Sequence, residues 1–171
     1  MVFSYFKFSS LSNTSNIETT TKTVFAKSIP TETVAGIISN NQDLTDFKKY
    51  IKTTAQFGSL DNTEPFTVFA FTNNAFKSAD SEAKAIFADN SKTEIQKNIL
   101  SYHIVNGNIK TDAMTEGQKL KTLQGSEIVV KVEDKDIFIV DMKGNKAHVE
   151  KAGIPAKNGS VYIIDGVLLP Q

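Results

Sequence analysis

Residues able to carry acid–base or metal chemistry are scarce in this chain of 171 residues. It has two histidines, His103 and His148, and no cysteine. The lack of cysteine excludes a thiolate nucleophile, a disulfide and a cysteine-based metal site. The histidines stand far apart, and neither has a second ligand at the short spacing typical of metal sites. We therefore expect no metal and no cofactor.

The serines do not complete a catalytic motif. Ser126 and Ser160 each follow a glycine, but both begin strand-like runs, where a turn explains them. The chain contains no Gly-x-Ser-x-Gly elbow, no His-Glu-x-x-His helix and no glycine-rich phosphate loop. Sequence does not exclude a Ser–His–Asp site assembled from distant residues. The expectation is a protein that is not an enzyme, with a hydrolase as the third-ranked reading.

Two polar positions lie in apolar surroundings. Tyr102 and His103 interrupt the run from Ile99 to Val105, which we interpret as a strand. We expect both side chains to be buried and hydrogen-bonded internally. Asp165 stands in a second apolar strand, expected to run to Pro170. Because an isolated buried carboxylate is costly, it should accept hydrogen bonds from backbone or hydroxyl groups.

Composition narrows the choice of partners. Lysine plus arginine and aspartate plus glutamate number 19 each, so the formal net charge is zero. This balance argues against nucleic acid or an anionic membrane as a partner. No run approaches the roughly 18 apolar residues of a membrane-spanning helix. No signal-peptide core is visible at the amino terminus.

The chain divides into a leader and one domain. Residues 9–22 are rich in Ser, Thr and Asn, which predicts a flexible leader over residues 1–29 and a single domain over residues 30–171. Helical spacing is expected to start near Thr31 or Thr33, near Asp43 or Thr45, and at residues 81–88 and 93–100. Residues 127–133 and 136–141 predict a β-hairpin. The fold class is α+β, with helices covering one side of a largely antiparallel sheet.

Four ordered segments together resemble the fasciclin-like (FAS1) domain. They are residues 66–76, 99–107, 120–125 and 158–170, and the first and last match the two family signatures. Their physical reading agrees with the resemblance: a strand feeding a capped helix, and a turn feeding an apolar strand. The signature residues, expected to be structural, are Thr67, Phe69, Thr72, Asn73, Phe76, Asn158, Gly159, Asp165 and Pro170.

The resemblance implies a wedge-shaped β-sandwich with helices on one side. It also implies a monomeric, bacterial adhesion or interaction module that is extracellular, periplasmic or at the cell surface. Its partner is expected to be an extracellular protein or polysaccharide. The family's proposed adhesion motif maps to Tyr102, His103 and Ile104. Relatives that bind integrin carry an Asp-Ile pair where this chain has Gly153-Ile154, so that mode is not carried over.

The alternative function implied by the resemblance is a carrier of an apolar ligand such as a carotenoid. Twelve phenylalanines permit a groove between the helices and the sheet, although aromatic residues most often form an ordinary core.

Overall fold

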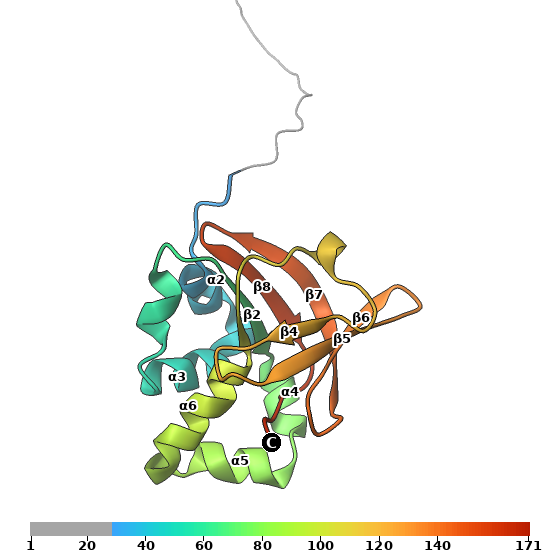
Figure 1. Cartoon of the computed structure of the whole chain (residues 1–171). Coiled ribbons are helices and arrows are strands. Elements are labelled where there is room, and N and C mark those ends of the chain that lie inside the picture. Colours follow the sequence, from blue (N-terminus) through green and yellow to red (C-terminus); the bar gives the residue numbers. More distant parts are fainter. Residues whose placement is uncertain (1–28) are drawn as a thin grey trace, which may run out of the picture.

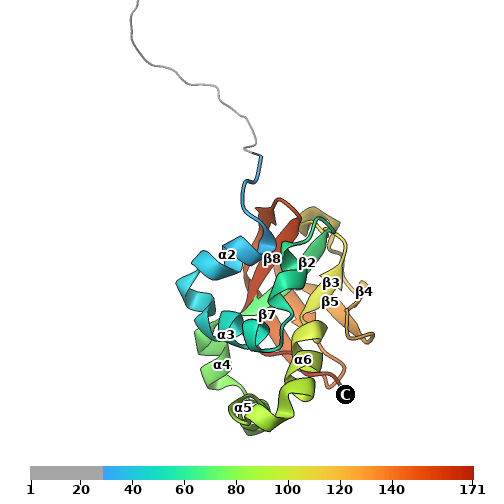
Figure 2. The same ribbon diagram turned by 90° about the vertical axis from the view of Figure 1, so that its left-hand side faces the viewer.

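A computed structural model of the chain describes residues 29–171. The predicted leader lies outside these residues except for Ile29, so its flexibility and the boundary at residue 30 stay predictions. Helices gather on one side and the base of the molecule, and a strongly curled sheet forms the other side (Figures 1 and 2). In chain order the elements are α2 Val34–Asn40, η3 Gln42–Leu44, α3 Thr45–Thr53, η4 Phe57–Asp61, β2 Phe66–Phe71, α4 Asn73–Ser78, α5 Ser81–Ala88, η5 Asn90–Lys92, α6 Thr93–Tyr102, β3 Ile104–Asn106, η6 Thr111–Ala113, β4 Lys119–Lys121, β5 Glu127–Glu133, β6 Asp136–Val140, β7 Lys146–Ala156 and β8 Gly159–Ile164.

Threonine side chains begin α2 and α4. The Thr33 hydroxyl oxygen accepts a hydrogen bond from Gly36 N at 3.1 Å and starts α2. Thr72 does the same for α4, accepting from Ala75 N at 3.0 Å. Each cap satisfies an amide that has no partner within the helix, which stabilises a helix by about 1 kcal/mol. The helix starts predicted at residues 45, 81 and 93 are confirmed.

Within residues 29–171 the seven strands follow the order β3-β2-β8-β7-β6-β5-β4. All pairs are antiparallel except β2 with β8. Every residue of β2 and of β8 is buried, as expected for neighbouring strands covered on both faces. The β5–β6 hairpin is confirmed, with Asp134 and Lys135 at positive φ in its turn.

Strand β7 makes the two halves of the sheet continuous. Its first residues pair with β6, and its later residues pair with β8. Irregular register near Lys151 and positive φ at Gly153 bend the strand between these halves. The predicted α+β class and FAS1-type fold are confirmed, and this bent strand joins the two halves into one seven-stranded sheet.

The core lies between the helices and the sheet. Its centre is a set of aromatic rings in edge or tilted contact: the Phe47 and Phe71 centroids are 5.0 Å apart, and those of Tyr50 and Phe87 are 4.5 Å apart. Phe47, Phe69 and Phe71 are fully buried. These phenylalanines therefore fill the interior, where such pairs add roughly 0.5–1.5 kcal/mol each beyond the burial of their area.

Candidate functional site

Tyr102 and His103 lie at a helix-to-strand junction. Tyr102 is the last residue of α6, His103 caps its end, and β3 begins at Ile104. The predicted strand through Tyr102 and His103 is therefore wrong. The helix continues two residues beyond its expected end because Ile99, Leu100 and Tyr102 still face the core. The expected burial of the pair is confirmed, since both side chains are 0% exposed.

Both ring nitrogens of His103 are occupied by the backbone. Leu168 N donates to Nε2 at 3.1 Å, so the ring proton resides on Nδ1, which donates to Ile99 O at 2.8 Å. Burial lowers the pKa of His103 to about 4, although the Ile99 carbonyl and Asp141 oppose that shift. The imidazole is neutral near pH 7. A general base needs a free nitrogen facing a substrate, and this ring has none.

The Tyr102 hydroxyl joins three parts of the fold. It donates to Glu127 O at 2.9 Å and accepts from Met142 N at 3.1 Å. These bonds connect α6 to the start of β5 and to the β6–β7 loop. Burial raises the pKa of Tyr102 above its usual range. Ile104 is 1% exposed, so the candidate adhesion motif Tyr102, His103 and Ile104 presents no side chain to a partner in the folded domain.

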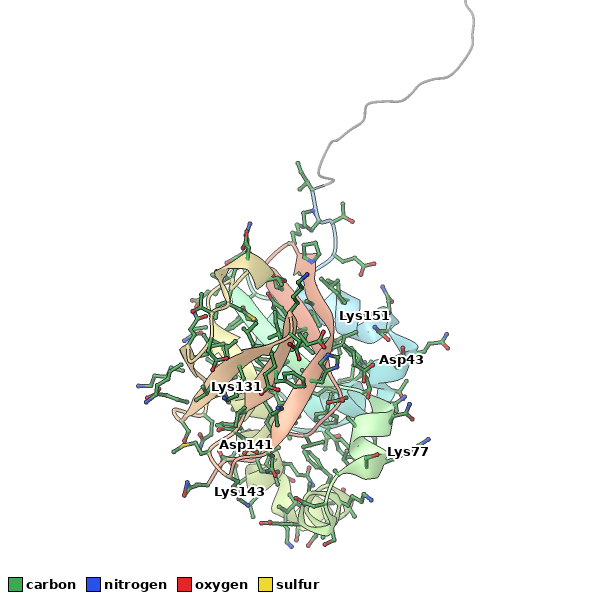
Figure 3. All side chains as sticks on the ribbon, turned by 90° about the vertical axis from the view of Figure 1, so that its right-hand side faces the viewer. Asp43, Lys77, Lys131, Asp141, Lys143 and Lys151 are labelled. Atoms are coloured by element: carbon green, nitrogen blue, oxygen red, sulfur yellow. The ribbon has the colours of Figure 1, made fainter. Side chains whose placement is uncertain are left out.

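Asp141, whose charge acts on His103, accepts hydrogen bonds from the backbone of two loops. This role was not predicted from the sequence. Asp141 lies at the base of the sheet in the β6–β7 loop (Figure 3). Oδ1 accepts from the amides of Lys143 at 2.9 Å and Asn145 at 2.8 Å, while Oδ2 accepts from Leu169 N at 2.9 Å. An aspartate leading into Lys143-Gly144-Asn145 is a typical Asx-turn signal, and that signal was available in the sequence.

Together these side chains hold the segment after β8. His103 takes the amide of Leu168 and Asp141 takes that of Leu169. The sequence predicted a strand running to Pro170, but β8 ends at Ile164. At Leu168 and Leu169 side chains, rather than a neighbouring strand, accept the backbone hydrogen bonds. Pro170, which follows Leu169, is half-buried.

Asn158 and Gly159 anchor the other end of β8. The Asn158 side chain accepts from Val34 N at 2.9 Å and donates to Leu60 O at 2.8 Å, joining α2 and η4 to the sheet. Gly159 has a φ of +149°, and a Cβ there would overlap the Phe66 carbonyl oxygen. Only glycine lets β2 approach β8 this closely.

Three other polar signature residues also make internal bonds. Thr67 Oγ1 donates to Gly107 O at 2.6 Å and accepts from Ile109 N at 2.9 Å. Asn73 Oδ1 accepts from Asp46 N at 3.0 Å. Asp165 is exposed, which corrects the expected burial, and it accepts from His148 N at 2.7 Å. It is exposed because β8 has already ended, yet the expected backbone donor is present.

The apolar signature residues belong to the core. Phe69 stacks on Tyr162 with the ring centroids 5.3 Å apart. Phe76 is half-buried and stacks on Tyr50, also at 5.3 Å. The signature residues therefore serve mainly as a scaffold. Thr72 and Asn73 also border a hollow of about 270 Å³ between α4 and β7.

Potential metal ligands are scattered within residues 29–171. This part of the chain holds no group of three or more His, Asp or Glu residues placed to bind a metal ion. His148 Nε2 lies 3.8 Å from Asp136 Oδ1 at the surface of the hairpin. Gly153 has a φ of +60°, and a Cβ there would overlap Thr111 Oγ1. An aspartate in the place of Gly153 would therefore require the Thr111 side chain to move and would strain the backbone at positive φ.

Two hollows are candidate binding surfaces. The larger, about 600 Å³, lies at the end of the sheet opposite α5 and is bordered by Pro30, Thr111, Pro155 and Ser160. No residue of α2–α6 lines it. The second, about 400 Å³, lies between β3 and β4 and is bordered by Asn106, Ile109, Lys119 and Leu123.

Comparison with known proteins agrees with the fold and the signatures. The family model described as "Fasciclin domain" matches residues 42–170. Protein sll1483 of Synechocystis sp. is 31% identical over 158 residues, covering 90% of this chain and 84% of that protein. Immunogenic protein MPB70 of Mycobacterium bovis is 34% identical, covering 80% of this chain and 68% of that protein. The chain belongs to the fasciclin domain family.

A solved structure shows the same fold. It is a FAS1 domain pair from the insect cell adhesion molecule Fasciclin I, with a TM-score of 0.71 and 22% identity, covering 82% of this chain and 51% of that one. Human periostin is 28% identical over 81% of this chain, but the match spans only 16% of periostin. No helix in the described part of the chain is long and apolar enough to cross a membrane.

Proposed function

We propose that this chain is a non-enzymatic, extracytoplasmic adhesion or interaction module that binds an extracellular protein or a polysaccharide. The observation that carries the proposal is the use of the polar signature residues. Backbone groups of the protein itself form the hydrogen bonds of the side chains of Tyr102, His103 and Asn158. Such residues build a scaffold, and recognition is left to the surface.

Family membership supports the kind of recognition. The solved FAS1 pair belongs to an insect cell adhesion molecule. The balanced net charge of this chain favours neither nucleic acid nor an anionic membrane surface as its partner.

The test immobilises the folded domain and measures binding of purified extracellular-matrix proteins and of cell-wall and capsular polysaccharides by surface plasmon resonance. Saturable binding to at least one of them is expected. The domain itself is expected to sediment as a monomer in analytical ultracentrifugation. Hydrolase and oxidoreductase substrates are screened with the same preparation. Turnover that follows the protein through purification and is lost in a folded His148→Ala or Ser160→Ala variant would overturn the non-enzymatic part.

Carriage of an apolar ligand is a second candidate because of the larger hollow. Its volume of about 600 Å³ lies in the usual range of ligand pockets, roughly 300–1,000 Å³. Pro30, Pro155 and Ala156 give it apolar walls. It lies away from the expected place between the helices and the sheet, which aromatic rings fill. A rise in melting temperature with β-carotene or palmitate would favour this candidate, and no rise would count against it.

A further inference from the structure

The sheet almost closes into a barrel, but the two strands at its ends are poorly joined. Strands β3 and β4 have three residues each. An isolated antiparallel bridge between Val105 and Thr122 connects them, and Leu123 N donates to Ile104 O at 2.8 Å beside it. Among the residues that the structure describes, no pairing of β3 with β4 continues beyond this bridge, and residues of both strands border the hollow of about 400 Å³. We call this opening the β3–β4 seam.

The ladder between β4 and β5 shows which backbone groups face the seam. Val130 N donates to Gln118 O at 2.8 Å, and Thr122 N donates to Ser126 O at 3.0 Å. In an antiparallel pair the backbone groups of alternate residues point to opposite sides of the strand. The amides and carbonyls of Lys119 and Lys121 therefore point away from β5 and into the seam. An edge of this kind is a template for another strand.

Side chains along β4 alternate between the two faces of the sheet. Lys119 and Lys121 are exposed, whereas Leu120 is 4% exposed and faces the interior. A strand added to this edge would place its own residues in the same alternation. Residues opposite the lysines would point outward, and the residue between them would point toward Leu120 and Ile109, which line the hollow.

The positive charges of Lys119 and Lys121 determine which kind of strand can pair with the edge of β4. Short edge strands carrying lysine are a common protection against pairing with a second copy, because like charges directly opposite one another repel. Glu127 Oε1 lies 4.0 Å from Lys119 Nζ, a long and exposed contact that leaves most of the lysine's charge available. An acidic residue opposite each lysine would be attracted instead.

We propose that the β3–β4 seam binds an extended segment of a partner protein, which adds as a strand to the free edge of β4. The segment alternates acidic and apolar residues, the acidic ones facing Lys119 and Lys121. Backbone hydrogen bonds to the edge supply the affinity and alternate side chains supply the specificity, as in other cases of strand addition. This inference rests on the protein-binding form of the proposed function.

The test adds a capped octapeptide of alternating glutamate and valine to the isotope-labelled domain. Nuclear magnetic resonance then follows amide shifts and hydrogen exchange. Exchange at the Lys119 and Lys121 amides should slow, with the largest shifts at these residues and at Asn106. An octapeptide of alternating lysine and valine should bind at least about tenfold more weakly, because of the reversed charge. Unchanged exchange at both amides would overturn the proposal.

Variants separate charge from backbone pairing. The double change Lys119→Glu and Lys121→Glu should reverse the preference between the two peptides. Lys151→Glu is the matched control, because Lys151 is an exposed lysine on β7 (Figure 3). Lys119→Pro removes a seam-facing donor without taking a bond from the β4–β5 ladder, and it should abolish binding of the glutamate–valine peptide.

Two results keep this proposal distinct from the proposed function. If a matrix protein or polysaccharide binds the domain and the Lys119 and Lys121 variants do not affect that binding, the seam is not the site. The seam proposal would then be wrong while the general function stands. Binding of the glutamate–valine peptide that ignores the double charge reversal would also overturn it.

Discussion

The polar groups at the two ends of the short segment from Tyr102 to Asn106 differ in burial and in hydrogen bonding. At its start, the Tyr102 hydroxyl and both His103 nitrogens are buried and fully bonded. At its end, the backbone meets a seam closed by one bridge. The comparison teaches that the conspicuous side chains hold the fold, whereas the open hydrogen-bonding capacity belongs to backbone that no motif marks.

The largest expected effect on stability is at the buried scaffold, where β2 and β8 are in closest contact. Gly159→Ala puts a methyl group onto the Phe66 carbonyl, which forces β2 and β8 apart. We expect the free energy of unfolding to fall by about 4 kcal/mol or more, measured by urea denaturation. Gly144→Ala is the control, since nothing lies within 4 Å of a Cβ there although its φ is also positive. Equal losses in both variants would mean that φ alone, not the contact, is responsible.

His103 should make the closed region sensitive to acid. Its pKa is about 4 in the folded protein, against an ordinary value of 6.5. Between these values the unfolded chain binds a proton that the folded chain does not, so stability falls as the pH falls through this window. The loss levels off below pH 4 at about 3 kcal/mol.

The surroundings of His103 define the control for this prediction. Leu168 N, the Ile99 carbonyl, Asp141 and the rings of Phe47 and Phe71 face it. His103→Gln cannot titrate, so the difference in unfolding free energy between wild type and this variant should narrow between pH 6.5 and 4. A difference that stays constant across this range would contradict the prediction.

Tyr102→Phe should have an intermediate effect. It removes the hydroxyl that joins Glu127 O and Met142 N and leaves the ring in place. We expect a loss of about 1–2 kcal/mol, because two backbone groups lose a partner. Tyr162→Phe provides a comparison, since its hydroxyl donates to Ile109 O at 2.8 Å in another part of the fold. Amide exchange at Met142 should accelerate only in Tyr102→Phe.

The smallest expected effect on stability is at the seam. Changing Lys119 and Lys121 together to glutamate should alter the unfolding free energy by less than about 1 kcal/mol, because both side chains are exposed and the one contact between Lys119 and Glu127 is long. Thermal denaturation measures this directly. A loss comparable to that of Tyr102→Phe would show that the seam is part of the scaffold and would remove the contrast between the two regions.

Local patterns predicted most of the elements. A helix start near Thr31 or Thr33 and a capped helix within residues 66–76 were predicted, and Thr33 and Thr72 are the caps. The β5–β6 hairpin was located by its alternation. Such features depend on a few neighbouring residues, so they can be predicted from the sequence alone. The junction at Tyr102 was misassigned because an apolar run of this length fits both a helix end and a buried strand.

The seam and the role of Asp141 depend on distant pairings. Asp141 binds Leu169, and β4 approaches β3 rather than extending the sheet outward. Neither pairing leaves a periodic signal in the chain. The exposure of Asp165 was missed for the same reason, since it follows from where β8 loses its neighbours.

The parallel pairing of β2 and β8 has a consequence for how the protein is made. Strand β2 is apolar at five of six positions, and its parallel partner β8 is made only after the intervening residues 72–158. The nascent chain must keep this apolar segment from misassociating until β8 has been made. Assembly should consequently be slow for the size of the domain, since distant strands have to meet before the interior can form.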